Sequence, residues 1–322
     1  MLAGSLKQVQ HVLNRFVIGN VGHDQVTGKE RRMDTVQMTL PPSGDGTSVV
    51  NELRSHCQVR LAGALYAGIM HGSLGSDEVQ PYSDVDALVI IKDDHCESGV
   101  PTAKVRQQLR QLQRLFYKHD PLQHHGFFVL AENDLSHWPE HYLPTAALAQ
   151  GSVFSQPHEL QLQICRFFDH GKSHAAASTM VDGVRNEIQS KRFLAGMYQL
   201  KSMLSKLMLL PAMYLQVRDG HGVFKKDSFE AAKDDFGKSS WFAVEQATQI
   251  RSLWPQLKLR HPHWLFASPG RLGSLSRRRF GYSIPDHIKA LLNETFLKST
   301  IQFVEEVGKF LLSHDRIKHN AV

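Results

Sequence analysis

The most constraining feature of the sequence is a short apolar run with two carboxylates at its head. Val85–Ile91 reads VDALVII, a β-branched and apolar pattern that predicts a buried strand. Asp84 and Asp86 stand two residues apart, and the period of two along a strand places both carboxylates on one face. Carboxylates that close repel each other, and a divalent cation between them removes the conflict. Mg²⁺ accepts one or two carboxylates and completes its shell with water and phosphate oxygens. On this spacing alone, an aspartate-rich turn before the strand is the alternative interpretation.

A glycine-serine turn precedes the carboxylates. Gly72 lets the backbone approach a ligand closely, and Ser73 offers a hydroxyl and a backbone N–H to a phosphate oxygen. Ten residues, 74–83, separate this turn from Asp84. Each feature alone is common in ordinary turns. Together, the turn, the gap and the two strand-borne carboxylates predict a site for metal-dependent phosphoryl or nucleotidyl transfer.

The two halves of the 322-residue chain differ in character. In the first half, apolar strand candidates such as Val85–Ile91 alternate with helical segments. From His158 onward, the long periodic segments are helical. We therefore expect a mixed α/β domain with a short mixed sheet over 1–155 and an all-α helical bundle over 156–322, divided at the Pro157 break.

The pattern of the first half resembles a known family. Gly72-Ser73 followed by Ser83-Asp84-Val85-Asp86-Ala87-Leu88-Val89 is similar to the nucleotidyltransferase signature of the polymerase-β superfamily, and most of all to its small bacterial members such as the aminoglycoside nucleotidyltransferases. The resemblance covers residues 55–131, about a quarter of the chain. It implies a nucleotidyltransferase fold for the first domain and a substrate-binding role for the helical domain.

The resemblance also implies an activity and a set of site residues. The chain would be an enzyme that moves an NMP from an NTP, with ATP as the expected donor, to a hydroxyl acceptor and releases pyrophosphate. Asp84 and Asp86 would be catalytic metal ligands, for two Mg²⁺ ions with Mn²⁺ as a substitute. Gly72, Ser73 and Ser83 would contact the nucleotide. The acceptor stays open among an antibiotic, a sugar, a protein side chain and an RNA end.

One element of the superfamily pattern is missing. Its active members carry a third carboxylate on a neighbouring strand, which binds the second metal or acts as base. The neighbouring strand is expected at 124–130 and contains no acid. His125 could fill that place as a general base near neutral pH, and Glu132 could reach in from the strand end. The further alternative is that the third function is lost. The chain would then be a catalytically silent member that binds nucleotide or a macromolecule as a regulator.

Two lysines of the helical half are candidates for binding the triphosphate. Lys201 lies on a long helical segment, and Lys225 precedes a predicted helix start. For either lysine, a solvated helix face is the alternative. Histidine pairs such as His137 and His141 lack a cysteine or acidic set at zinc spacing, so they predict no structural zinc site.

Composition limits the partners and the location. The chain has 37 Lys+Arg against 31 Asp+Glu, a formal net charge of +6. This basic excess suits an anionic partner, either an NTP or a nucleic acid, although it also serves as an ordinary solubility charge. The longest apolar stretch, Leu61–Met70, is far short of the ~20 residues of a membrane span, so no membrane partner is expected. Three cysteines without metal-ligand spacing favour a reducing compartment, and the cytoplasm is the expected location.

Overall fold

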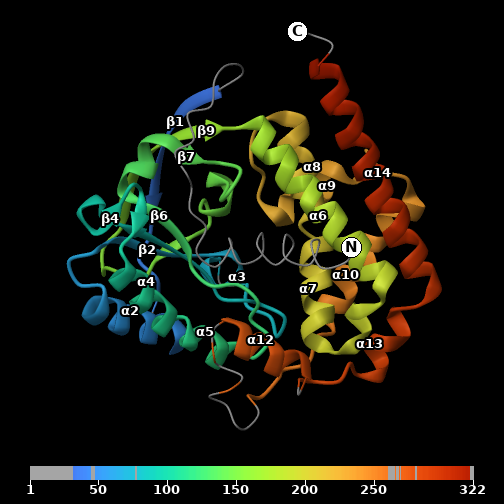
Figure 1. Cartoon of the computed structure of the whole chain (residues 1–322), viewed down its shortest axis with the longest axis horizontal. Helices are drawn as coiled ribbons and strands as arrows, with labels where there is room; N and C mark the ends of the chain where they lie inside the picture. Colours follow the sequence, from blue (N-terminus) through green and yellow to red (C-terminus); the bar gives the residue numbers. More distant parts are fainter. Residues whose placement is uncertain are drawn as a thin grey trace. The chain divides into compact units, whose positions relative to one another are not determined.

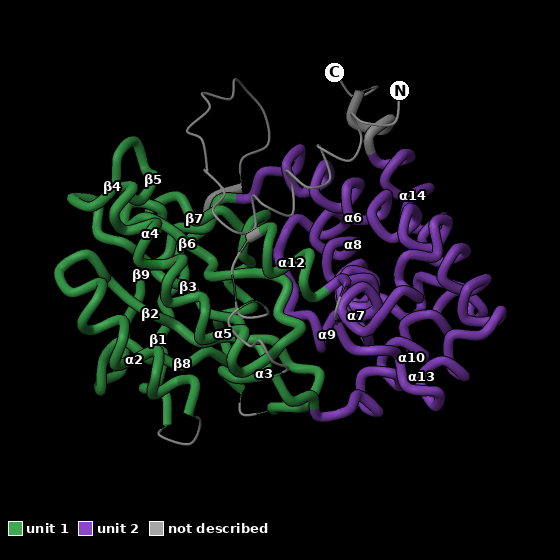
Figure 2. Tube along the Cα trace, turned by 60° about the horizontal axis from the view of Figure 1, so that its bottom comes forward, with its two compact units in different colours: residues 1–167, 257–277 green, residues 168–256, 278–322 purple. Residues whose placement is uncertain are grey.

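The chain forms two compact units in the computed structural model (Figures 1 and 2). The residues that the structure describes are 32–44, 48–76, 78–259, 265, 268, 270–279 and 281–319. Unit 1 consists of Met1–Phe167 and Leu257–Arg277, and unit 2 consists of Phe168–Gln256 and Arg278–Val322. The division therefore lies after Phe167 rather than at residue 155, and a later segment returns to unit 1.

A four-stranded mixed sheet forms the centre of unit 1, in the order β6-β3-β2-β8. Its strands are β2 (Leu65–His71), β3 (Asp86–Ile91), β6 (Phe128–Ala131) and β8 (Ser152–Val153). β2 is antiparallel to both β3 and β8, whereas β3 runs parallel to β6. The buried strand and the short mixed sheet that the sequence predicts are confirmed.

β3 is buried on both faces because its residues alternate between two cores. Val89 and Ile91 pack into one core, whereas Leu88 and Ile90 pack into the other. The first core is shared with α2 (Ser48–Arg60), α4 (Ala103–Leu112) and α5 (Arg114–His119), three helices that are labelled in Figure 1. Only a continuous apolar run satisfies both cores, which is why this segment has no alternating polar residues.

The second core is closed by a three-stranded sheet in the order β1-β9-β7. Its strands are β1 (Arg32–Leu40), β7 (Trp138–Pro139) and β9 (Leu160–Phe168). In β9, Leu160, Leu162 and Ile164 are buried, whereas the glutamines between them are exposed. The expectation that structure after His158 is helical is wrong here, since this period of two forms a strand. β9 extends unit 1 to Phe167, which is why the predicted boundary at Pro157 falls short.

Unit 2 is helical, as the sequence predicts. Its helices are α6 (His170–Ser190), α7 (Met197–Leu207), α8 (Leu210–Asp219), α9 (Lys225–Lys233), α10 (Lys238–Ser252), α13 (Asp286–Leu291) and α14 (Glu294–His319). α12 (Gly270–Arg279) begins in unit 1 and ends in unit 2. The predicted fold class, a mixed α/β part followed by a helical region, is confirmed. Within the described part of the chain, no helix has the length and apolar character needed to cross a membrane.

Short elements complete the described chain. They are α3 (Gly72–Gly75), the small pair β4 (Cys96–Glu97) and β5 (Val100–Pro101), and the 3₁₀ turns η1 (Asp93–His95), η2 (Glu132–His137), η3 (Thr145–Ala147) and η4 (Arg192–Ala195). Of these, α3 is the one that positions the candidate site, because it directly follows the end of β2.

Candidate functional site

Gly72 lies against the carboxylate of Asp86 at one end of the central sheet. Asp86 begins β3 and pairs in register with His71, the last residue of β2. The turn that starts at Gly72 therefore emerges beside the Asp86 side chain. Gly72 has a φ of 61°, and a Cβ at this position would lie 2.4 Å from Asp86 Oδ2. Only glycine permits this approach, so the structure brings the predicted Gly72-Ser73 turn and Asp86 together.

Gln123 fixes the backbone between the two aspartates. Its side chain is fully buried, its Oε1 accepts a hydrogen bond from the Val85 N–H at 2.9 Å, and its Nε2 donates to the Val85 carbonyl at 3.2 Å. The same Nε2 donates to the His125 carbonyl at 3.1 Å. One amide group therefore holds the backbone around Asp84 and Asp86 in a fixed relation to the loop before β6.

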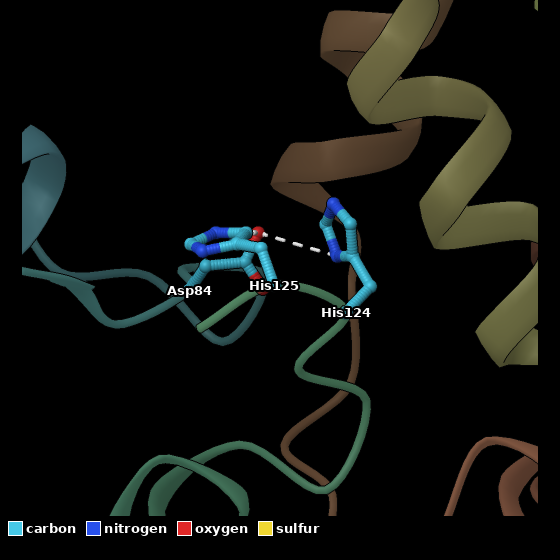
Figure 3. Close-up of side chains that lie close together, drawn as sticks. All are labelled: Asp84, His124 and His125. Atoms are coloured by element: carbon cyan, nitrogen blue, oxygen red, sulfur yellow. Dashed lines mark ion pairs between the residues drawn. The ribbon is translucent and has the colours of Figure 1, made fainter. Parts of the chain in front are cut away.

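Two histidines of that loop face Asp84 (Figure 3). His125 Nε2 lies 3.1 Å from Asp86 Oδ1 and 3.9 Å from Asp84 Oδ2. His124 Nδ1 lies 3.7 Å from the same Asp84 oxygen. The side chains of Asp84, His124 and His125 are only 12%, 19% and 15% exposed. Their donor atoms all lie within 4.8 Å of one another, which makes the three residues a candidate metal-binding cluster.

The charges of this cluster set its protonation. Burial disfavours the protonated form of His125, but the hydrogen bond to Asp86 and the negative charges of Asp86 and Asp84 outweigh it and raise the pKa of His125 to about 9. Burial also disfavours the charged form of Asp86, yet the hydrogen bond and charge of His125 lower the pKa of this carboxyl. In this state His125 is an imidazolium at pH 7, so it does not match the near-neutral base that the sequence suggests.

His71 lies at the edge of the same cluster. Its side chain is 5% exposed, and burial lowers its pKa against the opposing charge of Asp86. Its ring contacts the Phe128 ring, with centroids 5.1 Å apart, and the Phe128 ring in turn contacts His125. Among the residues that the structure describes, no hydrogen-bond partner reaches the buried Nε2 of His71. This atom is suited to bonding a polar group of a bound ligand.

Glu132 does not join the carboxylates. β3 and β6 are parallel, with Ile91 paired to Ala131, so Glu132 follows the end of the sheet opposite to Asp86. At ~3.3 Å per strand residue, the two acids are roughly 15–20 Å apart along the sheet. Glu132 instead lines an open pocket together with Thr35 and Cys165. Of the two residues considered for the third carboxylate's place, His125 is the one beside the aspartates.

The remaining predicted contacts lie in other settings. Ser83 is 5% exposed, and its Oγ accepts a hydrogen bond from the Gln80 N–H at 2.9 Å, which closes the turn before Asp84. Lys201 is fully buried on α7, and Lys225 begins α9, both in unit 2. The assignment of these three residues to the nucleotide stays a prediction.

Sequence reasoning missed His71, Gln123 and His124 as members of the site. His71 and His124 stand next to residues that the motif singles out, and adjacency was the available signal. Gln123 lies 38 residues from Val85, and its two hydrogen bonds to that backbone depend on how β3 and the loop before β6 come together. No residue spacing within the sequence predicts such a contact.

Comparisons with known proteins add little to this geometry. No protein-family model matches the chain, and no curated protein matches it. Among solved structures, the chain is similar to the spectinomycin adenyltransferase AAD(9) from Enterococcus faecialis, crystallised with ATP and spectinomycin. The two chains are 13% identical, the match covers 71% of this chain and 97% of the other, and the TM-score is 0.38. A functional assignment therefore rests on the site itself.

Proposed function

We propose that the chain is a divalent-cation-dependent nucleotidyltransferase that uses an NTP, with ATP as the first choice. The acceptor is a hydroxyl compound, and pyrophosphate is the second product. The observation that carries this proposal is that Gly72 lies against the Asp86 carboxylate at one end of the central sheet, while Asp84 faces the same His125 nitrogen as Asp86. A glycine turn and a carboxylate pair suited to a cation lie next to each other there, and phosphoryl transfer uses both kinds of group.

Asp84 and Asp86 are the residues that would hold the cation. Their side chains are 12% and 27% exposed, so both are largely withdrawn from water yet still reachable. Mg²⁺ takes one or two carboxylates with water and phosphate oxygens in its other positions, and Mn²⁺ accepts the same donors, so the carboxylate pair fits either ion. When bound, such an ion neutralises charge on the phosphate oxygens.

The chain's own contribution is positioning. Gly72 lets the backbone come close to the triphosphate, and the Ser73 hydroxyl and N–H are its proposed hydrogen-bond donors to phosphate oxygens. Gln123 holds Asp84 and Asp86 in place through the Val85 backbone. Fixed groups of this kind accelerate in-line displacement by orienting the reactants and by avoiding reorganisation in the transition state.

The experiment is a screen of the four NTPs against pooled hydroxyl acceptors, including aminoglycosides, sugars and RNA ends, read by the mass shift of the acceptor. The wild type is compared with Asp84→Asn/Asp86→Asn and with Asp94→Asn, a matched control whose carboxylate is 74% exposed after the same strand. Transfer by the wild type and the control but not by the double variant supports the proposal. Equal transfer by all three proteins contradicts the role of the carboxylate pair.

A catalytically silent nucleotide-binding regulator is the alternative. It is favoured by the 3.1 Å contact of His125 with Asp86, where an imidazolium and not a third carboxylate faces the pair. Cation-dependent NTP binding by the wild type without a mass shift on any acceptor would support this alternative.

We also propose a cytoplasmic location. Cys57, Cys96 and Cys165 are all free thiols, as expected in a reducing compartment.

A further inference from the structure

We infer that Asp84, His124 and His125 bind a divalent transition ion of the Zn²⁺ class directly, before any nucleotide arrives. Two imidazole nitrogens from adjacent residues of the loop before β6 and one carboxylate oxygen from Asp84, just before β3, converge there (Figure 3). Imidazole nitrogen is a donor that Zn²⁺ and its first-row neighbours favour, whereas Mg²⁺ is held by oxygen. The inference shares Asp84 with the proposed transfer reaction, but it concerns binding and stands without turnover.

The distances suit a transition ion. Asp84 Oδ2 lies 3.7 Å from His124 Nδ1 and 3.9 Å from His125 Nε2. Ligands at the usual zinc bond lengths of about 2.0–2.2 Å lie roughly 3.4 Å apart in a tetrahedral site. Movements of a few tenths of an ångström therefore bring Asp84 Oδ2 to this separation from each imidazole nitrogen, and all three donor atoms already lie within 4.8 Å of one another. The corresponding octahedral spacing for Mg²⁺, at bonds of about 2.1 Å, is roughly 3.0 Å and requires larger movements.

A neighbouring carbonyl already holds the His125 ring in the orientation that a metal needs. His125 Nδ1 lies 3.1 Å from the Gly126 carbonyl, and a carbonyl can only accept, so Nδ1 carries the proton of that bond. This leaves Nε2 directed at Asp84 and Asp86. A ligating histidine whose other nitrogen donates to a backbone carbonyl is the common arrangement in metal sites. An ion at Nε2 would take the place of the proton that His125 now shares with Asp86.

Gln123 supports two of the three ligands at once. Its amide bonds the Val85 backbone next to Asp84 and the carbonyl of His125 itself. The backbone of these two ligands therefore loses little conformational freedom on binding. Asp86 is left for the cation that accompanies a triphosphate, so a resident transition ion and an incoming Mg²⁺ would occupy neighbouring positions.

The test is calorimetric titration of the chelator-treated, full-length protein with Zn²⁺, Mn²⁺ and Mg²⁺ in the absence of nucleotide. Co²⁺ serves as a spectroscopic probe, because its visible absorption reports nitrogen coordination. The variants are His124→Ala and His125→Ala, with His137→Ala as an exposed histidine control in the same unit. Circular dichroism confirms that each variant is folded, and His124→Gln or His125→Gln replaces the alanine variant at the same position if that variant is not.

One Zn²⁺ per chain is expected, bound at least ~100-fold more tightly than Mg²⁺. The loss in His124→Ala and His125→Ala should exceed the roughly 10–100-fold typical of removing a group that merely orients a ligand. His137→Ala should bind as the wild type does. Zn²⁺ binding no tighter than Mg²⁺, or unchanged binding in both site variants, would overturn the inference. Zn²⁺ binding without any transfer would leave the inference standing and contradict the proposed enzyme, whereas transfer with Mg²⁺ alone and no Zn²⁺ site would do the reverse.

Discussion

At the residue scale, the site depends on a backbone conformation at Gly72 that a residue with a side chain would disturb. Gly72 turns with a positive φ directly under Asp86, and His71 before it faces the same carboxylate across the strand pair. Both constraints arise from the last residue of β2 and the first of β3 being partners. The role proposed for Asp86 therefore requires a residue without a Cβ at position 72.

Replacing Gly72 tests this dependence. Gly72→Ala places a methyl group 2.4 Å from Asp86 Oδ2 and strains a positive φ, so we expect an unfolding free energy lower by about 1–3 kcal/mol from the backbone alone. Nucleotide binding should be lost at temperatures where the variant is still folded. Gly44→Ala is the control, because nothing lies within 4 Å of a Cβ there. Equal denaturation midpoints for the two variants would contradict the geometry.

Gln123 gives a second prediction at this scale. Gln123→Ala leaves the Val85 N–H and carbonyl without their side-chain partner, at a cost of roughly 1–3 kcal/mol for each buried group. We expect faster hydrogen exchange at the Val85 amide and loss of nucleotidyl transfer in a folded protein. Unchanged exchange at Val85 together with full transfer would remove Gln123 from the positioning role.

At the element scale, the parallel pairing of β3 and β6 decides which residue can stand in for the third carboxylate. The pairing of Ile91 with Ala131 puts Glu132 at one end of the sheet and leaves His125 at the other, beside Asp86. Residue spacing alone does not distinguish His125 from Glu132, because the two residues flank the same short strand. The direction and register of β6 relative to β3 determine which of them lies beside Asp86.

A pair of substitutions tests the register. Glu132→Gln should transfer nucleotide like the wild type, whereas His125→Ala should lose at least ~10-fold, the lower end of the range for a group that orients a metal ligand. Both are read in the same labelled-NTP assay. Loss in Glu132→Gln with full activity in His125→Ala would show that the assignment is inverted.

The individual elements also show which features of the fold can be predicted from the sequence alone. The strand at 85–91, the glycine-serine turn and the carboxylate pair were predictable, because each is encoded within a few neighbouring residues. β9 was predictable in principle, since Leu160, Leu162 and Ile164 alternate with exposed glutamines, but the helical character of the second half obscured it. The contacts of Gln123 and the convergence of His124 on Asp84 depend on tertiary packing and could not be foreseen.

At the scale of the whole molecule, a buried acid outside the candidate site affects stability. Glu140, 2% exposed, accepts hydrogen bonds from the Thr145 N–H at 3.1 Å and from its hydroxyl at 2.6 Å. Burial raises the pKa of this carboxyl above its ordinary value of 4.5, although the Thr145 hydrogen bonds oppose the shift. A group raised in the folded state contributes stability that is fully present below the unfolded pKa and is lost as the pH rises through the folded value.

Glu140→Gln removes this titration while keeping an oxygen that can accept the Thr145 bonds. We therefore expect the variant to gain stability relative to the wild type as the pH rises from about 4 to 7, the interval above the unfolded pKa. Urea denaturation at several pH values gives the difference directly. A difference that is constant across this range, or that moves in favour of the wild type, would contradict the raised pKa of Glu140.

The central claim is that a nucleotide binds at the Gly72–Asp86 end of the central sheet, and its most direct measurement needs no acceptor. Calorimetric titration with ATP, with and without Mg²⁺, compares the wild type with Asp86→Asn and with the exposed control Asp94→Asn. The account predicts cation-dependent ATP binding by the wild type and by Asp94→Asn, and its loss in Asp86→Asn. ATP binding of equal strength in all three proteins, or by none of them, would contradict it.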